Sequence, residues 1–346
     1  MADDFTFVTG ATGFIGSHVV RLLRARGDRV RILMRQSSPA RNIEGLGCEI
    51  VVGDLREASS LVRCVQGCRC VYHVAADYRL WARNSQEIYD CNVAGTRNLL
   101  SACCEAGVDR VIYTSTVGTI GLRPDGVPGD EETPVSLDDM IGHYKRSKFM
   151  AEQVAIEFAH SGLPLVIVNP TAPVGAGDIK PTPTGKIVLD FLRGRLPAYV
   201  DTGLNIVAVE DVAHGHLLAA EKGRVGERYI LGGENLTLQQ ILEILARMSG
   251  SRIPRFPMPW VAALIAAYVN QFFVGTILRR EPTIPLDGVR MARHKMWVNC
   301  DKARRELGYN PKSAEEALRE AVEYFRTGRQ PVTARDGVSN LHTGAA

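Results

Sequence analysis

A tyrosine and a lysine four residues apart are the side chains of this sequence best suited to proton chemistry. They stand in the run Tyr144-Lys145-Arg146-Ser147-Lys148, and this spacing places both on one face of a helix. A phenol with an ordinary pKa of about 10 is a poor base at neutral pH, but a nearby ammonium favours the phenolate. The pair therefore predicts general acid/base chemistry at Tyr144, with an ordinary surface helix pair as the alternative.

Three hydroxyl residues, Thr114-Ser115-Thr116, follow a β-branched apolar run some thirty residues before the tyrosine. Side chains at such a strand end reach the ligand crevice of a parallel sheet. One of the three hydroxyls can hold a substrate oxygen in line with Tyr144. For any single one of them, ordinary turn chemistry is the alternative.

A glycine-rich turn directly follows the first apolar run of the chain. Its sequence is Thr9-Gly10-Ala11-Thr12-Gly13-Phe14-Ile15-Gly16. Gly10 can make a tight turn, Gly13 can bring bare backbone against a pyrophosphate, and Gly16 lets helix and strand pack closely. The amides at the start of the following helix would face the phosphates. The order of strand, glycine turn and helix predicts a dinucleotide-binding turn.

The residues after the second strand bear on the choice between the two nicotinamide cofactors. Segment 34–38 contains Arg35 and no acid. A guanidinium can pair with a 2′-phosphate, whereas NAD recognition usually employs a carboxylate at this place. The segment therefore favours NADP over NAD, with a solvated surface arginine as the alternative. Asp54 and Leu55 stand where an adenine edge would pass, although Asp54 could instead cap a helix beginning near Glu57.

The elements that must position these groups alternate between strand and helix patterns. Strands are expected at residues 5–8, 30–33, 49–52, 71–74, 111–114 and 165–168, and helices at 15–26 and 93–106. Such alternation is typical of an α/β fold with a doubly wound parallel sheet of the Rossmann type. The ligand is expected across the carboxyl ends of the strands.

After residue 170 the alternation loosens. With 346 residues, the chain is long enough for two domains. We expect an NAD(P)-binding domain over 1–170 and a smaller, mainly substrate-binding C-terminal domain over 171–329, whose segments can interleave with the sheet. Residues 330–346 are polar and aperiodic and are expected to form a mobile tail.

Charge and cysteine content exclude several classes of protein. A net charge of +3 leaves no basic field of the size that nucleic acid requires. The eight cysteines lack zinc-type spacing, so we expect reduced thiols and no metal site. The N-terminus has neither the basic nor the apolar region of a secretory signal, and a cytoplasmic location is expected.

Taken in order, these motifs resemble those of extended short-chain dehydrogenases/reductases. The matching segments are Gly10-x-x-Gly13-x-x-Gly16, Asp54-Leu55, His73-Val74-Ala75-Ala76, Asn92-Val93-x-Gly95-Thr96, Thr114-Ser115-Thr116, Tyr144-x-x-x-Lys148 and Asn169-Pro170. The resemblance covers residues 4 to 328. Within the superfamily the chain is similar to the dihydroflavonol 4-reductase-like branch, and in particular to bacterial hopanoid-associated sugar epimerases.

The resemblance implies a role for each matching residue. Tyr144 would be the catalytic acid/base, Lys148 its partner and a holder of the nicotinamide ribose, and Thr116 the catalytic Ser/Thr. A homodimer through the helices flanking Tyr144 is also implied. The residues expected at the cofactor are Gly10, Thr12, Gly13, Phe14, Ile15, Gly16, Arg35, Asp54, Leu55, Ala75, Ala76, Thr114, Tyr144, Lys148, Pro170 and Thr171.

The sequence departs from relatives that act on nucleotide sugars. Those proteins usually carry an arginine and a histidine for the diphosphate where this chain has Leu204 and Ala208. A nucleotide diphosphate needs such cations. Arg193 and Arg195 could substitute, although they are explained more simply as cations at a helix end.

Residues 260–278 form an apolar stretch, barely long enough to span a bilayer, with Asn270 and Gln271 near its middle. A buried or substrate-covering helix is the favoured interpretation. An interfacial helix that admits a lipid-like substrate and contacts the membrane is a second possibility, and a true span is a third.

We therefore expect an NADP-dependent oxidoreductase that transfers hydride between nicotinamide and a carbonyl or secondary alcohol of an apolar or lipid-linked small molecule. An NAD(P)-dependent sugar epimerase or dehydratase of hopanoid biosynthesis is the alternative within enzymes. A non-catalytic dinucleotide sensor is the alternative of another class.

Overall fold

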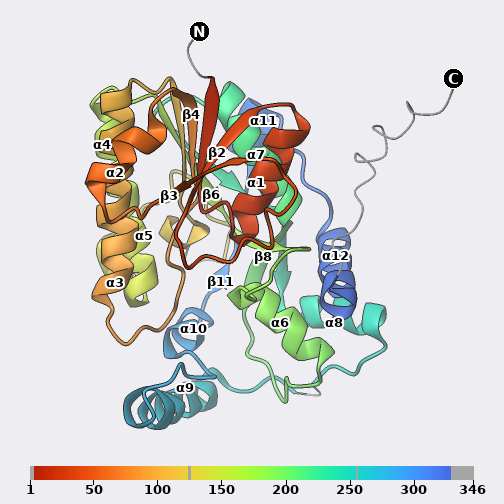
Figure 1. Cartoon of the computed structure of the whole chain (residues 1–346). Coiled ribbons are helices and arrows are strands. Elements are labelled where there is room, and N and C mark those ends of the chain that lie inside the picture. The colour runs from red at the N-terminus through yellow and green to blue at the C-terminus, as the bar shows by residue number, and fades with distance from the viewer. Residues whose placement is uncertain (1–3, 124–125, 255, 329–346) are drawn as a thin grey trace, which may run out of the picture.

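A seven-stranded parallel sheet forms the centre of the molecule (Figure 1). The computed structural model describes residues 4–123, 126–254 and 256–328. The strand order is β3-β2-β1-β4-β5-β6-β9. The strands are β1 (Phe5–Thr9), β2 (Arg29–Met34), β3 (Glu49–Val52), β4 (Cys68–His73), β5 (Arg110–Thr114), β6 (Leu165–Pro170) and β9 (Arg228–Leu231). The order reverses between β1 and β4, which is where a doubly wound sheet opens a ligand crevice.

Helices cover both faces of this sheet, as Figure 1 shows. One face carries α2 (Ala58–Val65), α4 (Gly95–Ala106) and α5 (Gly142–His160). The other carries α1 (Phe14–Ala25), α7 (Val209–Lys222) and α11 (Asp301–Leu307). Because both faces are covered, the central strands are apolar on both sides, and β1 is buried at all five positions.

Short segments connect the sheet to these helices. A four-residue helix α3 (Gln86–Tyr89) and a π-helical turn η1 (Asp90–Ala94) lead into α4. Two 3₁₀ turns, η2 (Val117–Thr119) and η3 (Leu137–Asp139), lie between β5 and α5. The turn η2 lies at the carboxyl end of β5, so it borders the crevice.

A smaller sheet lies beneath the carboxyl ends of the main one. It consists of β7 (Ala172–Val174), β8 (Gly203–Ala208), β10 (Glu234–Thr237) and β11 (Lys295–Met296), with β8 paired to each of the other three. Helices α6 (Pro183–Leu192), α8 (Leu238–Ser249) and α12 (Ala314–Thr327) pack on it around a separate apolar core. Farther out are α9 (Trp260–Asn270), the π-helical segment η4 (Gln271–Ile277) and α10 (Leu286–Met291).

The predicted fold class is confirmed, with one strand of the main sheet missed; the four strands of the smaller sheet were not predicted either. All six expected strands occur within a few residues of their predicted bounds, and the helix expected at 93–106 begins at Gly95 after the π-helical turn. The seventh strand, β9, lies beyond residue 171 and pairs with β6. The domain boundary at residue 171 stays a prediction, and the mobile tail predicted for 330–346 lies outside the described residues.

Candidate active site

The glycine turn is built around two very close backbone contacts. Gly10 has a φ of 71°, and a Cβ there would lie 2.6 Å from the amide nitrogen of Ala75. A Cβ on Gly16 would collide with the carbonyl of Gly10. Only glycine therefore lets the start of α1 pack on the end of β1 while the segment after β4 crosses above it. The exposed Gly13 caps α1, whose first turn holds no acid, and this leaves a helix N-terminus suited to phosphate.

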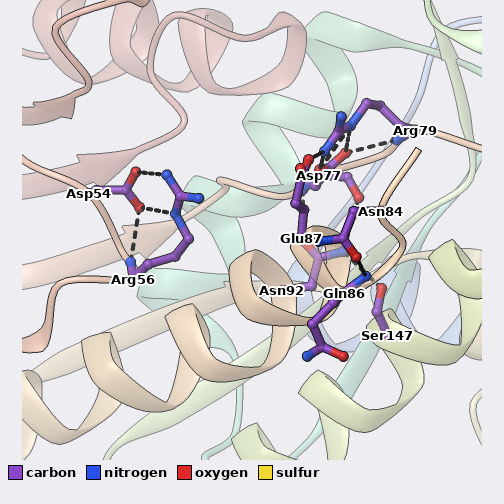
Figure 2. A network of polar contacts seen from close by, with 9 residues as sticks. All are labelled: Asp54, Arg56, Asp77, Arg79, Asn84, Gln86, Glu87, Asn92 and Ser147. Atoms are coloured by element: carbon purple, nitrogen blue, oxygen red, sulfur yellow. Dashed lines mark hydrogen bonds and ion pairs between the residues drawn. The ribbon is translucent and has the colours of Figure 1, made fainter. Parts of the chain in front are cut away.

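The adenosine end of the crevice carries two guanidinium groups beside one carboxylate. Asp54 accepts three hydrogen bonds from Arg56, the shortest at 2.6 Å from Nη2 (Figure 2). These bonds hold the pKa of Asp54 below its ordinary value, and the charge of the exposed Arg35 adds to the effect. The cap of α2 is Glu57, so the alternative interpretation of Asp54 as a helix cap is wrong. Leu55 is buried next to it.

Tyr144 and Thr116 meet at the mouth of the crevice. Thr116 caps η2, where its Oγ1 accepts from the amide of Gly118 at 3.1 Å. Burial raises the pKa of Tyr144 above its ordinary value, the nearby Thr116 hydroxyl lowers it in part, and the nearby Asp77 raises it further. Burial thus favours the neutral phenol, and the expectation that Lys148 together with an oxidised nicotinamide favours the phenolate stays a prediction.

The ammonium of Lys148 is almost completely buried, with 2% of the residue exposed. Its Nζ donates to the hydroxyl of Tyr113 at 3.0 Å and to the carbonyl of Thr114 at 2.7 Å. Burial lowers the pKa of Lys148 to about 8, with Glu152 acting in the opposite direction. The hydroxyl of Thr114 bonds instead to His216 at 2.9 Å, so Thr114 offers the site its carbonyl rather than its side chain.

A buried chain of polar groups joins Lys148 to the glycine turn. Tyr113, which accepts from Lys148, lies beside Thr96; burial raises the pKa of the Tyr113 phenol, and the Thr96 hydroxyl lowers it in part. The Oγ1 of Thr96 lies 3.0 Å from Nε2 of His73, whose Nδ1 lies 2.8 Å from Oγ1 of Thr9. Burial and the charge of Lys148 lower the pKa of His73 to about 3, so this imidazole is neutral at physiological pH. The two ends of the cofactor crevice are therefore held in a fixed relation by side chains of three strands, β1, β4 and β5, and two helices, α4 and α5.

A second buried network supports Thr116 from behind. Asn169, at the end of β6, donates to the carbonyl of Thr116 at 3.1 Å and to Glu152 at 2.9 Å. Glu152 also accepts from Thr119 at 2.8 Å and from Arg228 of β9 at 3.1 Å. Glu152 follows Lys148 by four residues and shares its helix face. This spacing was the signal in the sequence that could have identified it.

The segment after β4 is tied to α5 by side chains that the sequence analysis missed. Figure 2 shows Arg79 between two carboxylates. Its Nη2 lies 2.6 Å from Oδ2 of Asp77 and 2.9 Å from Oε2 of Glu87. Asn92 donates to the carbonyl of Asp77 and to the hydroxyl of Ser147, both at 2.9 Å. These contacts fix the segment that carries Ala75 and Ala76, at the place where it passes from the glycine turn toward Tyr144.

Two observations test whether these residues fit a nicotinamide dinucleotide. The contacts at Gly10 and Gly16 leave backbone rather than side chains facing the crevice. The hydroxyl of Thr171, directly after Pro170 at the end of β6, is buried and has no hydrogen-bond partner among the described residues. A carboxamide or ribose group placed there would supply one. The residues therefore fit the cofactor, although nothing here assigns individual contacts.

Uncharged side chains occupy the two positions where we expected cations in proteins that act on nucleotide sugars. Leu204 and Ala208 lie in β8, and Ala208 is completely buried. Arg193 and Arg195 are exposed beyond the end of α6, as the simpler interpretation of them predicted. The apolar stretch is not a buried helix, since only 17% of Trp260–Ile277 is buried. Of the two versions of the favoured prediction, the buried helix is wrong and the substrate-covering helix stays a prediction.

Comparisons with known proteins agree with this architecture. The sequence pattern of the NAD dependent epimerase/dehydratase family matches residues 6–232. A protein of Synechocystis sp. named after dihydroflavonol 4-reductase is 46% identical over 94% of this chain and 95% of its own length. Sterol demethylase protein B of Methylococcus capsulatus is 37% identical over 93% of this chain and 98% of its own length.

Solved structures show the same arrangement. A nucleoside-diphosphate-sugar epimerase from Pseudomonas aeruginosa superposes with a TM-score of 0.78 at 28% identity, covering 94% of this chain and 99% of that one. Family pattern, full-length relatives and fold therefore agree with one another. The chain belongs to the NAD-dependent epimerase/dehydratase family, a group of extended short-chain dehydrogenases/reductases, and is an NAD(P)-dependent enzyme.

Proposed function

We propose that this enzyme uses NADP to transfer hydride between nicotinamide and a carbonyl or secondary alcohol of an apolar or lipid-linked substrate. The observation that carries the proposal is the buried phenol of Tyr144 near the hydroxyl of Thr116, where burial raises its pKa and so favours the protonated form. A carbonyl that receives hydride must also receive a proton, and a neutral phenol is a proton donor.

The residues of the chain divide the work between them. Bound nicotinamide supplies or accepts the hydride. Thr116 donates a hydrogen bond to the substrate oxygen, and Tyr144 delivers its proton to the same atom. Lys148, held by Tyr113 and Thr114, places a positive charge near the phenolate that remains and so stabilises it.

The preference for NADP rests on the two guanidinium groups at the adenosine end. Arg35 is exposed, close enough to Asp54 to affect its pKa, and not preceded by an acid at the end of β2. The charge of Arg56 is largely matched by Asp54, which leaves Arg35 as the group for a 2′-phosphate. NAD remains the alternative, since the family is described by that cofactor.

The apolar nature of the substrate is supported by what the crevice lacks and by a relative. Leu204 and Ala208 provide no charge for a diphosphate. The relative from Methylococcus capsulatus is named for a sterol demethylase, and a sterol is apolar. A homodimer and a cytoplasmic location stay predictions from the sequence.

Epimerisation of a sugar or sugar-like polyol is the second candidate, favoured by the likeness to the Pseudomonas aeruginosa epimerase. It uses the same oxidation but returns hydride to the other face of a retained cofactor. Following NADPH absorbance during turnover separates the two: steady consumption supports reduction, while product formation without consumption supports epimerisation.

Replacing Tyr144 by Phe is expected to remove most turnover and to leave dinucleotide affinity nearly unchanged. The variant loses only the oxygen that carries the proton, a contribution of about 10²–10⁴-fold in rate. Single-turnover hydride transfer and a fluorescence titration of NADPH measure the two quantities. A variant that keeps more than about a tenth of the wild-type rate would contradict the assigned role.

The rate should fall as pH rises through about 8, because Lys148 then loses the charge that supports the phenolate. Lys148→Met is expected to remove this limb of the pH profile. Lys145→Met is the matched control, since burial lowers the pKa of Lys145 to about 8 as well. The assignment fails if the Lys145 variant loses the limb and the Lys148 variant keeps it.

Arg35→Ala is expected to weaken NADP by about tenfold or more and to leave NAD unchanged. The substitution deletes a charge-assisted contact, worth about 1.5–3 kcal/mol, that only the 2′-phosphate makes. Calorimetric titration of both cofactors checks this, with Arg63→Ala on the exposed face of α2 as the control for charge. Equal weakening of both cofactors in the Arg35 variant would defeat the assignment.

An apolar substrate class predicts that a polyprenyl-linked polyol binds more tightly than a nucleotide sugar. A hydrocarbon tail would contribute about 25 cal/mol per Å² of buried apolar surface without charge pairing. Calorimetry with the NADP-loaded enzyme compares the affinity of the polyprenyl-linked polyol with the affinities of UDP- and dTDP-sugars. Micromolar binding of a nucleotide sugar, with none of the lipid-linked polyol, would sink this proposal while leaving the oxidoreductase chemistry intact.

A further inference from the structure

Exposed apolar side chains are concentrated in one small part of the molecule. Ten of the seventeen large apolar side chains that are exposed among the described residues lie within residues 256–284. This segment contains α9 and η4, which stand apart from both sheets at one end of the molecule (Figure 1). Patches of this kind mark a surface that meets an apolar partner.

The helix α9 has the reverse of the pattern found in a helix that faces water. Its buried positions are the small residues Ala263 and Ala267. The large residues Val261, Ile265 and Val269 point outward, with 59%, 59% and 52% of each exposed. Phe272 and Phe273 continue the exposed surface into η4 at 57% and 54%. Packing against the protein body therefore does not account for these large side chains, since small ones occupy the buried positions.

Positive charge surrounds this apolar surface. Residues 252–295 contain seven Lys and Arg and only two acids, whereas the whole chain has a net charge of +3. Arg279 and Arg280 are exposed directly after η4 and form no ion pair with any residue that the structure describes. Arg293 lies over the ring of Trp260 at 5.3 Å. An apolar face with arginines and aromatic rings at its border is suited to anionic lipid headgroups above a hydrocarbon layer.

We propose that the docking face, formed by α9, η4 and the arginines that follow, binds the surface of an anionic bilayer. The helix lies in the interface and does not cross the membrane, because both of its ends are fixed to the protein body. Before it, the amide of Met258 donates to the carbonyl of Tyr199 at 2.6 Å. After it, Arg83 donates to the carbonyl of Arg279 at 2.8 Å.

The polar residue Asn270 supports the same orientation. Its side chain bonds to Thr283 at 3.2 Å and to the amide of Ile284 at 3.1 Å. The returning segment thus satisfies the side-chain amide of Asn270, which lowers the cost of placing it near hydrocarbon. A second copy of the chain is a poorer occupant, because a two-fold contact through this face would bring like charges together.

The docking face is joined directly to the wall of the active site. Asp287 of α10, eight residues after Arg279, packs against Gly142 so closely that a Cβ on Gly142 would collide with its carboxylate. Gly142 begins the helix that carries Tyr144. Gly288 lies beside Leu80 in the segment that follows β4. If the proposed apolar substrate is correct, docking here would bring the crevice to the layer in which that substrate dissolves, but the docking itself does not depend on it.

Vesicle sedimentation with the full chain, saturated with NADPH, tests the proposal. We expect the protein to pellet with vesicles containing about one third phosphatidylglycerol and to bind pure phosphatidylcholine about tenfold more weakly. Ile265→Asp with Phe272→Asp should abolish binding to both vesicles. Arg279→Glu with Arg280→Glu should abolish only the preference for the anionic vesicles.

Two controls make the result decisive. Val225→Asp alters a side chain that is 49% exposed on a loop before β9 and should leave vesicle binding unchanged. Circular dichroism and NADPH affinity should match the wild type in every variant. A wild type that stays in the supernatant with both vesicles would overturn the proposal. So would a dimer in sedimentation velocity that Ile265→Asp with Phe272→Asp dissociates while vesicle binding is unchanged, since the face would then join two copies.

Discussion

A buried ammonium is the constraint on which the active site depends. Lys148 is held away from water, and an isolated buried charge is costly unless acceptors surround it. Tyr113 and Thr114 supply two acceptors from one strand, and Glu152 supplies a compensating charge from the same helix. Each of these groups needs polar partners of its own. Glu152 is bonded to Asn169, which also donates to the carbonyl of Thr116. Tyr113 lies beside Thr96, which is bonded to His73. The position of the catalytic hydroxyls follows from satisfying that charge.

This arrangement affects the direction in which Tyr144 is prepared to act. Burial raises its pKa and the Asp77 carboxylate raises it further, while Thr116 opposes them in part. A phenol kept protonated is ready to give a proton, which suits reduction of a carbonyl. Oxidation of an alcohol would require the phenolate, and the charge of Lys148 together with an oxidised nicotinamide would have to overcome the burial. The pKa direction and the likeness to reductases therefore point the same way.

Features formed by residues close together in the sequence could be predicted, whereas strand pairings and ion pairs between distant segments were missed. The glycine turn could be predicted because its three glycines stand at fixed spacing between one strand and one helix, and at Gly16 the close contact is with the local backbone of Gly10. The strand β9 was missed because four residues of modest pattern, Arg228–Leu231, become a strand only through pairing with β6. The pairs Asp77 with Arg79 and Glu152 with Arg228 were missed for a related reason: charged residues are common on surfaces, and only the fold reveals that Glu152 is buried. The burial of Tyr144, which raises its pKa, could not be predicted because sequence spacing carries no information about burial.

Two neighbouring parts of the molecule reverse the usual distribution of side chains: charged groups are buried around Lys148 in α5, and large apolar groups are exposed on α9 and η4. The buried Lys148 and Glu152 are stabilised by partners within the chain, but Ile265, Phe272 and Phe273 have no comparable partners among the described residues. A soluble helix gains nothing from exposing such side chains, and it gains an aggregation liability. Because Asp287 packs against Gly142 at the start of the helix that carries Tyr144, the exposed segment and the helix of the buried charge share a direct contact through α10. A partner that covers the apolar face would therefore lie next to the wall of the crevice, where an apolar substrate would have to enter.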